Sequence, residues 1–405
     1  MSRNYRCVTA TSLAEIEPHR VAWQDLMSRA VEDNFYLSPA FLPATLRHHL
    51  LERYLVVFVY RTDAGGERLV AIAPFSCNRP TLKIPFTVLS GFASPHGYLS
   101  HPLLDRDDAD DALQALWEWI EQPTQPWQMI FFQGVSETSP FLPRLKSLLE
   151  KRDRRFLSKR MFMRPMLGRY ESFDAYLASL SPTRRKNYRR RWKQLMNDGS
   201  VDVVLHRNLE QAGDLAERFL RLEQRSWKGS HGTALACEPE DASFFREMVQ
   251  NGGREGNLFF VELKFNGKPI AMTSNFVVGQ TLFAFKIAYD PDYHEYSPGI
   301  LVEVQTVRLF QETPEIMRGE GGATGESYLR SYWRDLAEMR AFYIAMPRLL
   351  PHGYLSLLSW VWRGKGIFRR VTRKAPQLIG LKLYAMAPGP VATGNEMLLA
   401  TCQLS

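Results

Sequence analysis

Three turn-forming residues, Ser297-Pro298-Gly299, separate a turn rich in Asp, Tyr and His from the apolar run ILVEVQTVRLF. Proline is favoured at the first position of a helix. A helix that begins there presents unbonded N–H groups and the positive end of its dipole. Gly299 lets a ligand approach the backbone closely. The stretch could form an anion site, for instance for a pyrophosphate, but on the local sequence alone a plain helix cap is the favoured interpretation.

A second group with catalytic potential is Glu223, Trp227 and Lys228, at the end of the predicted helix 210–227. Glu223 and Trp227 are four residues apart, so we expect them to share a helix face. A carboxylate beside an indole can have a raised pKa, which suits a general base that deprotonates an attacking ammonium or hydroxyl. Lys228 is predicted to steady an anionic acceptor or cofactor. The alternative is a helix end with an aromatic anchor and two surface charges, and His231 is a second candidate base.

Two charged residues mark the predicted strand 281-TLFAFKIAYD-290. Lys286 stands in an otherwise apolar run, so we expect its side chain to point into a cleft and contact the substrate. Asp290 precedes a proline and either closes the turn or contacts the acceptor. For Asp290, the turn is the favoured interpretation.

A basic run, 184-RRKNYRRRWK-193, follows Ser181-Pro182, which predicts a helix start. Tyr188, Trp192 and Leu195 would form one apolar stripe on this helix. The basic side chains could bind nucleic acid, anionic lipid or a phosphorylated acceptor. The favoured interpretation is a solvated helix face with one buried stripe.

The composition is that of an ordinary globular chain. Its 405 residues suit two domains, and the net charge of +8 favours anionic partners such as nucleotides and cofactors of the CoA type. Cys7, Cys77, Cys237 and Cys402 are far apart and form no Cys/His cluster, so we expect no disulfide or metal site and a reducing, cytoplasmic environment. The N-terminus lacks the apolar core of a signal peptide, and the apolar stretch 342–362 is interrupted by Pro, Arg and His. No P-loop, GxSxG or HExxH motif is present.

Hydrophobic periodicity predicts the same order of elements in both halves of the chain: helices, then strands joined by tight turns, then a helix. This order suggests a weak duplication of one α/β unit. In the first half we expect helical structure over 18–52, a hairpin of strands 54–60 and 68–75, a helix over 109–122, a strand over 127–135 and a helix over 139–151. In the second half we expect helices within 172–199, a strand over 201–207, helices over 210–227 and 241–253, two hairpin turns within 258–290, and a helix from Pro298.

The strand, turn and helix around Ser297 resemble the acetyl-CoA site of the GNAT superfamily of N-acetyltransferases. In that superfamily a strand leads into an Arg/Gln-x-x-Gly-x-Gly/Ala turn that opens a helix. The matching positions here are His294-x-x-Ser297-x-Gly299, of which only the last agrees. The chain resembles in particular the CelD-like branch of bacterial cellulose biosynthesis, described as a BioF-like acetyltransferase domain. That branch is similar in build to Fem-type aminoacyltransferases, which carry two GNAT-like halves. The resemblance covers about 166–345 and is carried by 223–235, 267–304 and 322–333.

The resemblance implies direct acyl transfer from acetyl-CoA or another acyl-CoA, with no metal. The thioester would lie between splayed strands, where backbone amides near Ile287 and Ala288 face the developing oxyanion. The pyrophosphate would lie at 294–300, where backbone N–H groups of Ser297, Gly299 and Ile300 would bind it together with the His294 side chain.

The late segment 322-GATGESYLRSYW-333 also has a family role, near the acceptor. Its usual form begins with an Asp, whereas Glu320 or Gly321 stands there in this chain. Glu326 remains as a substrate contact, and Tyr328 as the acid that would reprotonate the thiolate. The alternative is a loop held by aromatic side chains.

We therefore predict an α/β protein with a mixed sheet, built of two GNAT-like lobes in tandem: 1–165, 166–345, and an apolar then basic extension, 346–405. The predicted function is acyl transfer from acyl-CoA to an amine or hydroxyl, in cellulose, exopolysaccharide or envelope biosynthesis. The alternatives are an inactive GNAT-like scaffold of a polysaccharide-synthesis complex, and a Fem-type enzyme that uses aminoacyl-tRNA. We expect a cytoplasmic protein that can touch the membrane surface through its basic tail. Under the main hypothesis we do not expect it to bind nucleic acid.

Overall fold

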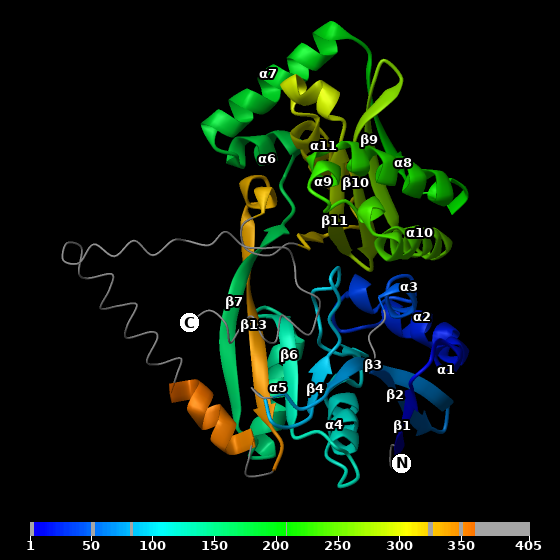
Figure 1. The fold of residues 1–405 in the computed structure, drawn as a ribbon, viewed down its shortest axis with the longest axis vertical. Helices are drawn as coiled ribbons and strands as arrows, with labels where there is room; N and C mark the ends of the chain where they lie inside the picture. The colour runs from blue at the N-terminus through cyan, green and yellow to red at the C-terminus, as the bar shows by residue number, and fades with distance from the viewer. Residues whose placement is uncertain are drawn as a thin grey trace, which may run out of the picture.

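One continuous sheet runs through both halves of the chain. The computed structural model describes residues 4–49, 53–81, 84–207, 209–322, 327–347 and 351–360. Within these residues thirteen strands pair in the order β1-β2-β3-β4-β6-β13-β7-β12-β11-β10-β9-β8, with β5 beside β3. Figure 1 shows two lobes joined by the long strands β7 (Phe156–Leu167) and β13 (Asp335–Ala345), which run from one lobe to the other. The predicted α/β class with a mixed sheet and two lobes is confirmed.

The first lobe has helices on both faces of its strands. In β2 the alternate residues Val57 and Val59 belong to the core under α4 and α5, whereas Val56 and Phe58 belong to the core under α2 and α3. Burial on both faces explains why this strand is apolar throughout instead of alternating. The strands are β1 (Asn4–Ala10), β2 (Tyr54–Asp63), β3 (Gly66–Asn78), β4 (Val88–Gly91), β5 (Leu103–Leu104) and β6 (Met129–Ser136). The helices are α1 (Leu13–Ile16), α2 (Arg20–Ser28), α3 (Leu42–His48), α4 (Ala109–Ile120) and α5 (Phe141–Lys151), with short 3-10 turns η1 (Glu17–His19) and η2 (Phe35–Leu37).

The second lobe follows the same rule. Phe259 and Val261 of β9 face the core beneath α6, α7 and α11, and Phe260 faces the core beneath α8 and α10. Its strands are β8 (Val201–His206), β9 (Leu258–Phe265), β10 (Lys268–Val278), β11 (Thr281–Tyr289) and β12 (Arg318–Glu320). Its helices are α6 (Phe173–Ser179), α7 (Pro182–Asp198), α8 (Ala212–Arg225), α9 (Trp227–Ser230), α10 (Pro239–Arg254) and α11 (Pro298–Glu312), with 3-10 turns η3 (Leu209–Gln211), η4 (Leu235–Cys237), η5 (Pro291–Tyr296) and η6 (Tyr328–Ser331).

Two sequence predictions differ from the structure. The helical stretch predicted over 18–52 is interrupted: α2 ends at Ser28, and Asn34 caps the separate turn η2 by accepting a bond from the Tyr36 N–H. The central strands β7 and β13 were missed. In β7 the apolar pattern is broken by Lys159, Arg160 and Arg164, and β13 begins with DLAEMR, so neither has the run of apolar residues that marks a buried strand.

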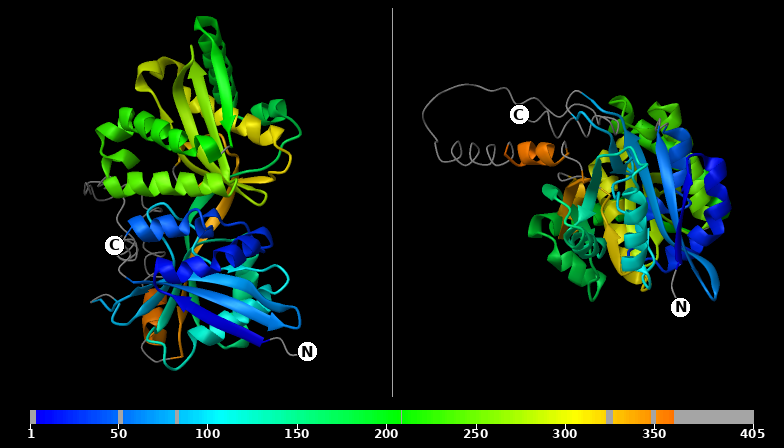
Figure 2. Two further views of the ribbon diagram at one scale, coloured as in Figure 1. Left: turned by 90° about the vertical axis from the view of Figure 1, so that its right-hand side faces the viewer. Right: turned by 90° about the horizontal axis from the view of Figure 1, so that it is seen from below.

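The two lobes share one apolar core. Phe35 of the first lobe stacks on Phe276 of β10, with ring centroids 4.2 Å apart. Helix α3 packs against α10, and the side view in Figure 2 shows these helices facing each other at the junction of the lobes. The lobes are therefore held together by packed side chains as well as by the shared sheet.

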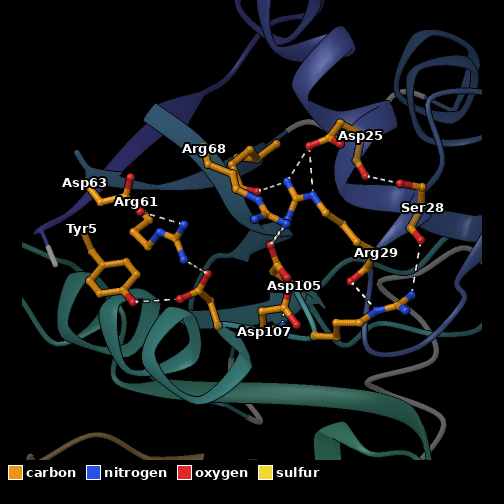
Figure 3. A network of polar contacts seen from close by, with 12 residues as sticks. Tyr5, Asp25, Ser28, Arg29, Arg61, Asp63, Arg68, Asp105 and Asp107 are labelled. Carbon is orange, nitrogen blue, oxygen red and sulfur yellow. Dashed lines mark hydrogen bonds and ion pairs between the residues drawn. The ribbon is translucent and has the colours of Figure 1, made fainter. Parts of the chain in front are cut away.

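Polar contacts stabilise the first lobe away from this junction. Arg29 and Arg68 both form ion pairs with the fully buried Asp105, and Arg29 also pairs with Asp25 (Figure 3). Arg61 pairs with Asp63 on the same strand. These contacts tie α2, β3 and the segment before α4 together, so we assign them a structural role.

Two further predictions, reduced cysteines and the absence of a membrane-spanning helix, can be compared with the described residues. Cys7, Cys77 and Cys237 are all unpaired thiols, as expected; Cys402 and the basic part of the predicted tail lie outside the described residues. Of the helices that the structure describes, none has the length and apolarity required to cross a bilayer.

Candidate active site

A cavity of about 580 Å³ opens in the second lobe. It lies between β11, the start of α11 and the segment that follows β12, with α7 and α9 at its edge. The structure brings together many residues that the sequence singled out. Trp227, Lys228, Lys286, Ile287, His294, Ser297, Gly299, Ile300 and Tyr328 all line this cavity. Glu223, Ala288 and Asp290 do not line it, and Glu326 lies outside the described residues.

The cavity exists because β11 separates from β12. Thr281 to Phe283 of β11 pair in parallel with Arg318 to Glu320 of β12, and the pairing stops there. On the other side β11 stays paired with β10, with a register shift opposite Ser274 and Asn275. Such a bulge bends a strand and re-aims its backbone. The backbone of β11 beyond Phe283 therefore has an open side toward the cavity, as the splayed-strand prediction requires.

The turn before α11 is held rigidly. Ser297 adopts a left-handed conformation (φ 52°), and its side-chain oxygen accepts a bond from Arg191 of α7. The Ser297 N–H donates to His294 O at 2.9 Å, and the Ile300 N–H donates to Ser297 O at 2.9 Å. Two of the three amides expected to bind a pyrophosphate are thus already bonded within the turn. For the third, the Gly299 N–H, no acceptor is provided by the part of the chain that the structure describes.

The group around Glu223 is arranged differently from the prediction. Helix α8 ends at Arg225 and the chain turns at Ser226, so Glu223 and Trp227 do not share a helix face. Glu223 is fully buried; its two oxygens accept bonds from Lys228 Nζ at 3.0 Å and from the Leu235 N–H at 2.9 Å. Trp227 is 53% exposed at the cavity edge, where it is free to stack against a ligand.

Two lysines bring positive charge to the cavity wall. Lys228 Nζ also donates to the carbonyl of Ile287 at 2.8 Å, which places its ammonium against the open strand. Lys286 points into the cavity as predicted, 3.9 Å from Glu223, and its burial lowers its pKa. An anionic ligand group would find complementary charge here.

Asp290 has the structural role that the sequence favoured. It is fully buried and forms ion pairs with Arg225 at 3.3 Å and Lys268 at 3.0 Å. It also accepts a bond from the Asp292 N–H, which begins the turn η5. These contacts fix the loop that leads into α11 and leave Asp290 behind the cavity wall.

The sequence reasoning missed the most unusual titratable group of the cavity, Glu303. This residue is 3% exposed on the inner side of α11, and its carboxylate accepts bonds from Trp333 Nε1 at 2.8 Å and from the Tyr328 hydroxyl at 3.2 Å. Burial raises the pKa of Glu303 to about 7, although both hydrogen bonds oppose this shift. A carboxyl group with such a pKa can take up and release a proton near neutral pH.

Tyr328 complements Glu303. Burial of its hydroxyl end and the nearby Glu303 carboxylate raise the pKa of Tyr328 well above its ordinary value, while the ring as a whole is 43% exposed. The hydroxyl therefore stays protonated and connects Glu303 with the cavity. A sequence signal for Glu303 did exist, because it is the single acid within the apolar run ILVEVQTV.

Comparison with known proteins identifies the class of this domain. The family model described as "Acetyltransferase (GNAT) domain" matches residues 182–314, so the chain carries a GNAT-fold acyltransferase domain. This range contains α7, the splayed strand β11 and α11, the elements that build most of the cavity. The resemblance stated above to the GNAT superfamily is thereby confirmed for this part of the chain. No curated protein matches the sequence.

Solved structures extend the likeness to both lobes. FemX superposes with a TM-score of 0.55 at 11% identity, covering 80% of this chain and 95% of FemX. A conserved protein of unknown function from Bacteroides thetaiotaomicron superposes with a TM-score of 0.52 at 12% identity, covering 81% of this chain and 97% of that protein. The C-terminal domain of a protein assigned as a lysylphosphatidylglycerol synthetase from Agrobacterium fabrum superposes with a TM-score of 0.51 at 13% identity, covering 84% of this chain and 95% of that domain. At such identities the likeness concerns the fold alone, and it extends over both lobes of the chain.

Proposed function

We propose that the chain transfers an acyl group from an acyl-CoA thioester to an amine or hydroxyl acceptor, in a single direct step. The observation that carries this proposal is the opening between β11 and β12, next to the Gly299 N–H at the start of α11, for which the described residues provide no acceptor. A thioester could lie along the open strand with its pyrophosphate near Gly299, where the helix dipole favours negative charge. Arg184, Lys228 and Lys286 add positive charge around the same cavity.

The proposed chemistry uses Glu303 in place of the expected Glu223. Glu223 is already ion-paired with Lys228, whereas Glu303 lines the cavity. Glu303 accepts the proton that the acceptor nitrogen or oxygen loses as it attacks the thioester carbonyl. The carbon–sulfur bond then breaks, and Tyr328 passes a proton to the departing thiolate and regains one from Glu303. The Ile287 N–H on the open strand is the proposed donor to the oxyanion.

The finer parts of the hypothesis remain proposals. Assignment to the CelD-like branch and a role in cellulose, exopolysaccharide or envelope biosynthesis rest on sequence resemblance. Membrane contact through the basic tail concerns residues outside the described part of the chain. An inactive scaffold is the competing possibility, and acyl-CoA binding distinguishes it from an enzyme.

Acyl-CoA binding is tested with two matched glycine variants. Gly299 and Gly213 are each the second residue of a helix, but a Cβ on Gly299 would lie 3.1 Å from the Tyr289 ring, while a Cβ on Gly213 meets nothing within 4 Å. We expect acetyl-CoA or a longer acyl-CoA to raise the Tm of the wild type. Gly299→Val should weaken this binding at least about tenfold, and Gly213→Val should leave it unchanged. If no acyl-CoA changes the Tm of the wild type, the proposed transferase is contradicted and the inactive scaffold becomes the favoured hypothesis.

A second candidate function is Fem-type transfer from an aminoacyl-tRNA, and helix α7 favours it. The helix carries Arg184, Arg185, Lys186, Arg189, Arg190, Arg191 and Lys193, and among the described residues none of these forms an ion pair with an acid. Like charges four residues apart, such as Arg185 and Arg189, repel each other on a helix. A phosphate backbone would relieve this repulsion.

The tRNA hypothesis predicts salt-dependent binding that depends on α7. Changing Arg185 and Arg189 to Gln should weaken tRNA binding and reduce the slope of log K against log salt by roughly two. The control changes Lys146 and Lys151 of α5 to Gln, which removes the same charge from two exposed positions on a helix of the first lobe. Equal effects of both pairs would indicate only a non-specific response to net charge.

A further inference from the structure

We propose that His49, His96 and Asp241 form a binding site for one divalent transition-metal ion, with Zn²⁺ as the best-fitting candidate, at the junction of the two lobes. Their ligand atoms all lie within 4.8 Å of one another. Imidazole nitrogen and carboxylate oxygen are ligands that zinc accepts, and three protein ligands leave a fourth position for water.

The three ligands come from separate elements that converge from both lobes. His49 follows the last residue of α3, His96 lies in the loop between β4 and β5, and Asp241 is in the first turn of α10. They are up to 192 residues apart in sequence. This separation explains why the sequence, which lacks a short metal-binding motif, predicted no metal.

The present distances are close to those of a metal site. His49 Nε2 lies 2.7 Å and His96 Nε2 lies 3.0 Å from the same oxygen of Asp241. With bonds of about 2.0–2.2 Å to zinc, neighbouring ligand atoms in a tetrahedral site are roughly 3.3 Å apart. An outward shift of the Asp241 oxygen by a few tenths of an ångström would make room for the ion beside each imidazole, and each imidazole would then bind it through Nε2 with its proton on Nδ1.

The surroundings hold the ligands in place. The His96 ring stacks on Phe244, with centroids 5.3 Å apart, and meets the edge of Phe285 at 5.9 Å. The backbone N–H of His96 donates to the Ser94 hydroxyl oxygen, which fixes the loop. Among the described residues no group hydrogen-bonds the Nδ1 atom of His49, so Nδ1 can carry the ring proton when Nε2, which now contacts Asp241, binds the metal. An apolar shell around polar ligands limits the access of water and other ligands.

The charges that face the site are balanced. Lys286 is the cation near His96, and it is itself accompanied by Glu223, at 3.9 Å. Asp241 contributes a carboxylate whose pKa is lowered, against its burial, by the bonds from His49 and His96. Because Phe285 also lines the acyl cavity, an ion here would fix the back wall of that cavity and the relative position of the lobes.

The neighbouring His48 supplies a matched control. His48 directly precedes the proposed ligand His49 and lies on the same interface, where its Nε2 atom is 2.8 Å from a carboxylate oxygen of Glu247 in α10. His48→Gln should therefore remove one histidine and one contact between the lobes without affecting the metal.

The experiment titrates the metal-free full chain with ZnCl₂ by calorimetry and with CoCl₂ by visible absorption. We expect one ion per chain and a higher Tm with Zn²⁺. His49→Gln, His96→Gln and Asp241→Asn should each weaken binding at least about 100-fold, the upper effect of losing a supporting group around a metal. His48→Gln should bind as the wild type does. Absence of stoichiometric binding, or equal losses in His48→Gln and His49→Gln, would overturn the proposal. Circular dichroism of each variant verifies that it is folded, and Asp241→Asn keeps the shape of the side chain if a histidine variant is unstable. Acyl-CoA binding is measured separately, so failure here does not bear on the proposed transferase.

Discussion

Replacing Glu303 by Gln is expected to lower kcat/KM for acyl transfer by about 100- to 10,000-fold, the usual contribution of a positioned general base. The amide has nearly the shape of the carboxyl group but cannot accept the acceptor's proton. Its oxygen can still accept the Trp333 N–H, and its NH₂ group would then face the Tyr328 hydroxyl, which can accept as well as donate. The measurement is steady-state kinetics with an acyl-CoA that the wild type binds.

The pH profile makes this prediction specific. Because the base must be ionised, wild-type kcat/KM should rise with pH through an apparent pKa of about 7, and this limb should disappear in Glu303→Gln. Glu255 offers a control, since burial also raises its pKa to about 7, but it does not line the cavity. Glu255→Gln should keep both the rate and the limb. A full rate in Glu303→Gln would exclude Glu303 as the base.

The ionisation of Glu303 should also affect stability, but whereas kcat/KM rises with pH, the free energy of unfolding should fall. The folded pKa of Glu303 is raised from 4.5 to about 7, so the folded chain binds more protons here than the unfolded chain between these values. The free energy of unfolding therefore falls as pH rises through this window, by on the order of 3 kcal/mol for Glu303 alone. Glu255 contributes a fall in the same window. The difference between wild type and Glu303→Gln in urea unfolding at pH 4.5 and 8 isolates the Glu303 part.

How far the site could be predicted depends on whether its residues are neighbours in sequence. The turn 294–300 and the strand that contains Lys286 were recognised because turn residues, a proline and an apolar strand stand side by side. The bond that fixes this turn against α7 was not foreseen, because Arg191 and Ser297 are 106 positions apart in sequence. Glu303 was passed over for a related reason: its burial comes from Trp333 and Tyr328, which the fold brings across from another segment.

The fold shows the same division between local and distant information. Hairpins were predicted well, since Asn266-Gly267 lies at the turn between β9 and β10 and the turn residues alone indicate it. The strands that join the lobes were not predicted. The Arg164 side chain interrupts the apolar pattern of β7, yet it is fully buried, because a partner on β12 compensates its charge. Periodicity records burial of apolar residues and is blind to burial of paired charges.

Replacing Arg164 by Met should therefore destabilise the protein by about 3–5 kcal/mol in urea unfolding, the usual cost of removing one partner of a buried ion pair. Arg164 Nη1 lies 2.5 Å from Glu320 Oε1, and these side chains are 0% and 9% exposed. Without the guanidinium, Glu320 would remain as a buried and unpaired charge between β7 and β11. Arg160→Met is the matched control on the same strand: its side chain is 60% exposed, so its pair with Glu338 should contribute less than about 1 kcal/mol.

The cause of this loss can be separated from a simple packing defect by a second substitution and by pH. Arg164→Met combined with Glu320→Gln removes both charges and should recover most of the lost stability, since an uncharged replacement of a buried pair is often neutral. In the single variant, acidification that protonates the unpaired Glu320 carboxylate removes the buried charge and should reduce the deficit. If the deficit is the same at low and neutral pH and persists in the double variant, packing of the Arg164 side chain against the Tyr98 and Phe162 rings, and not its charge, is what joins the lobes here.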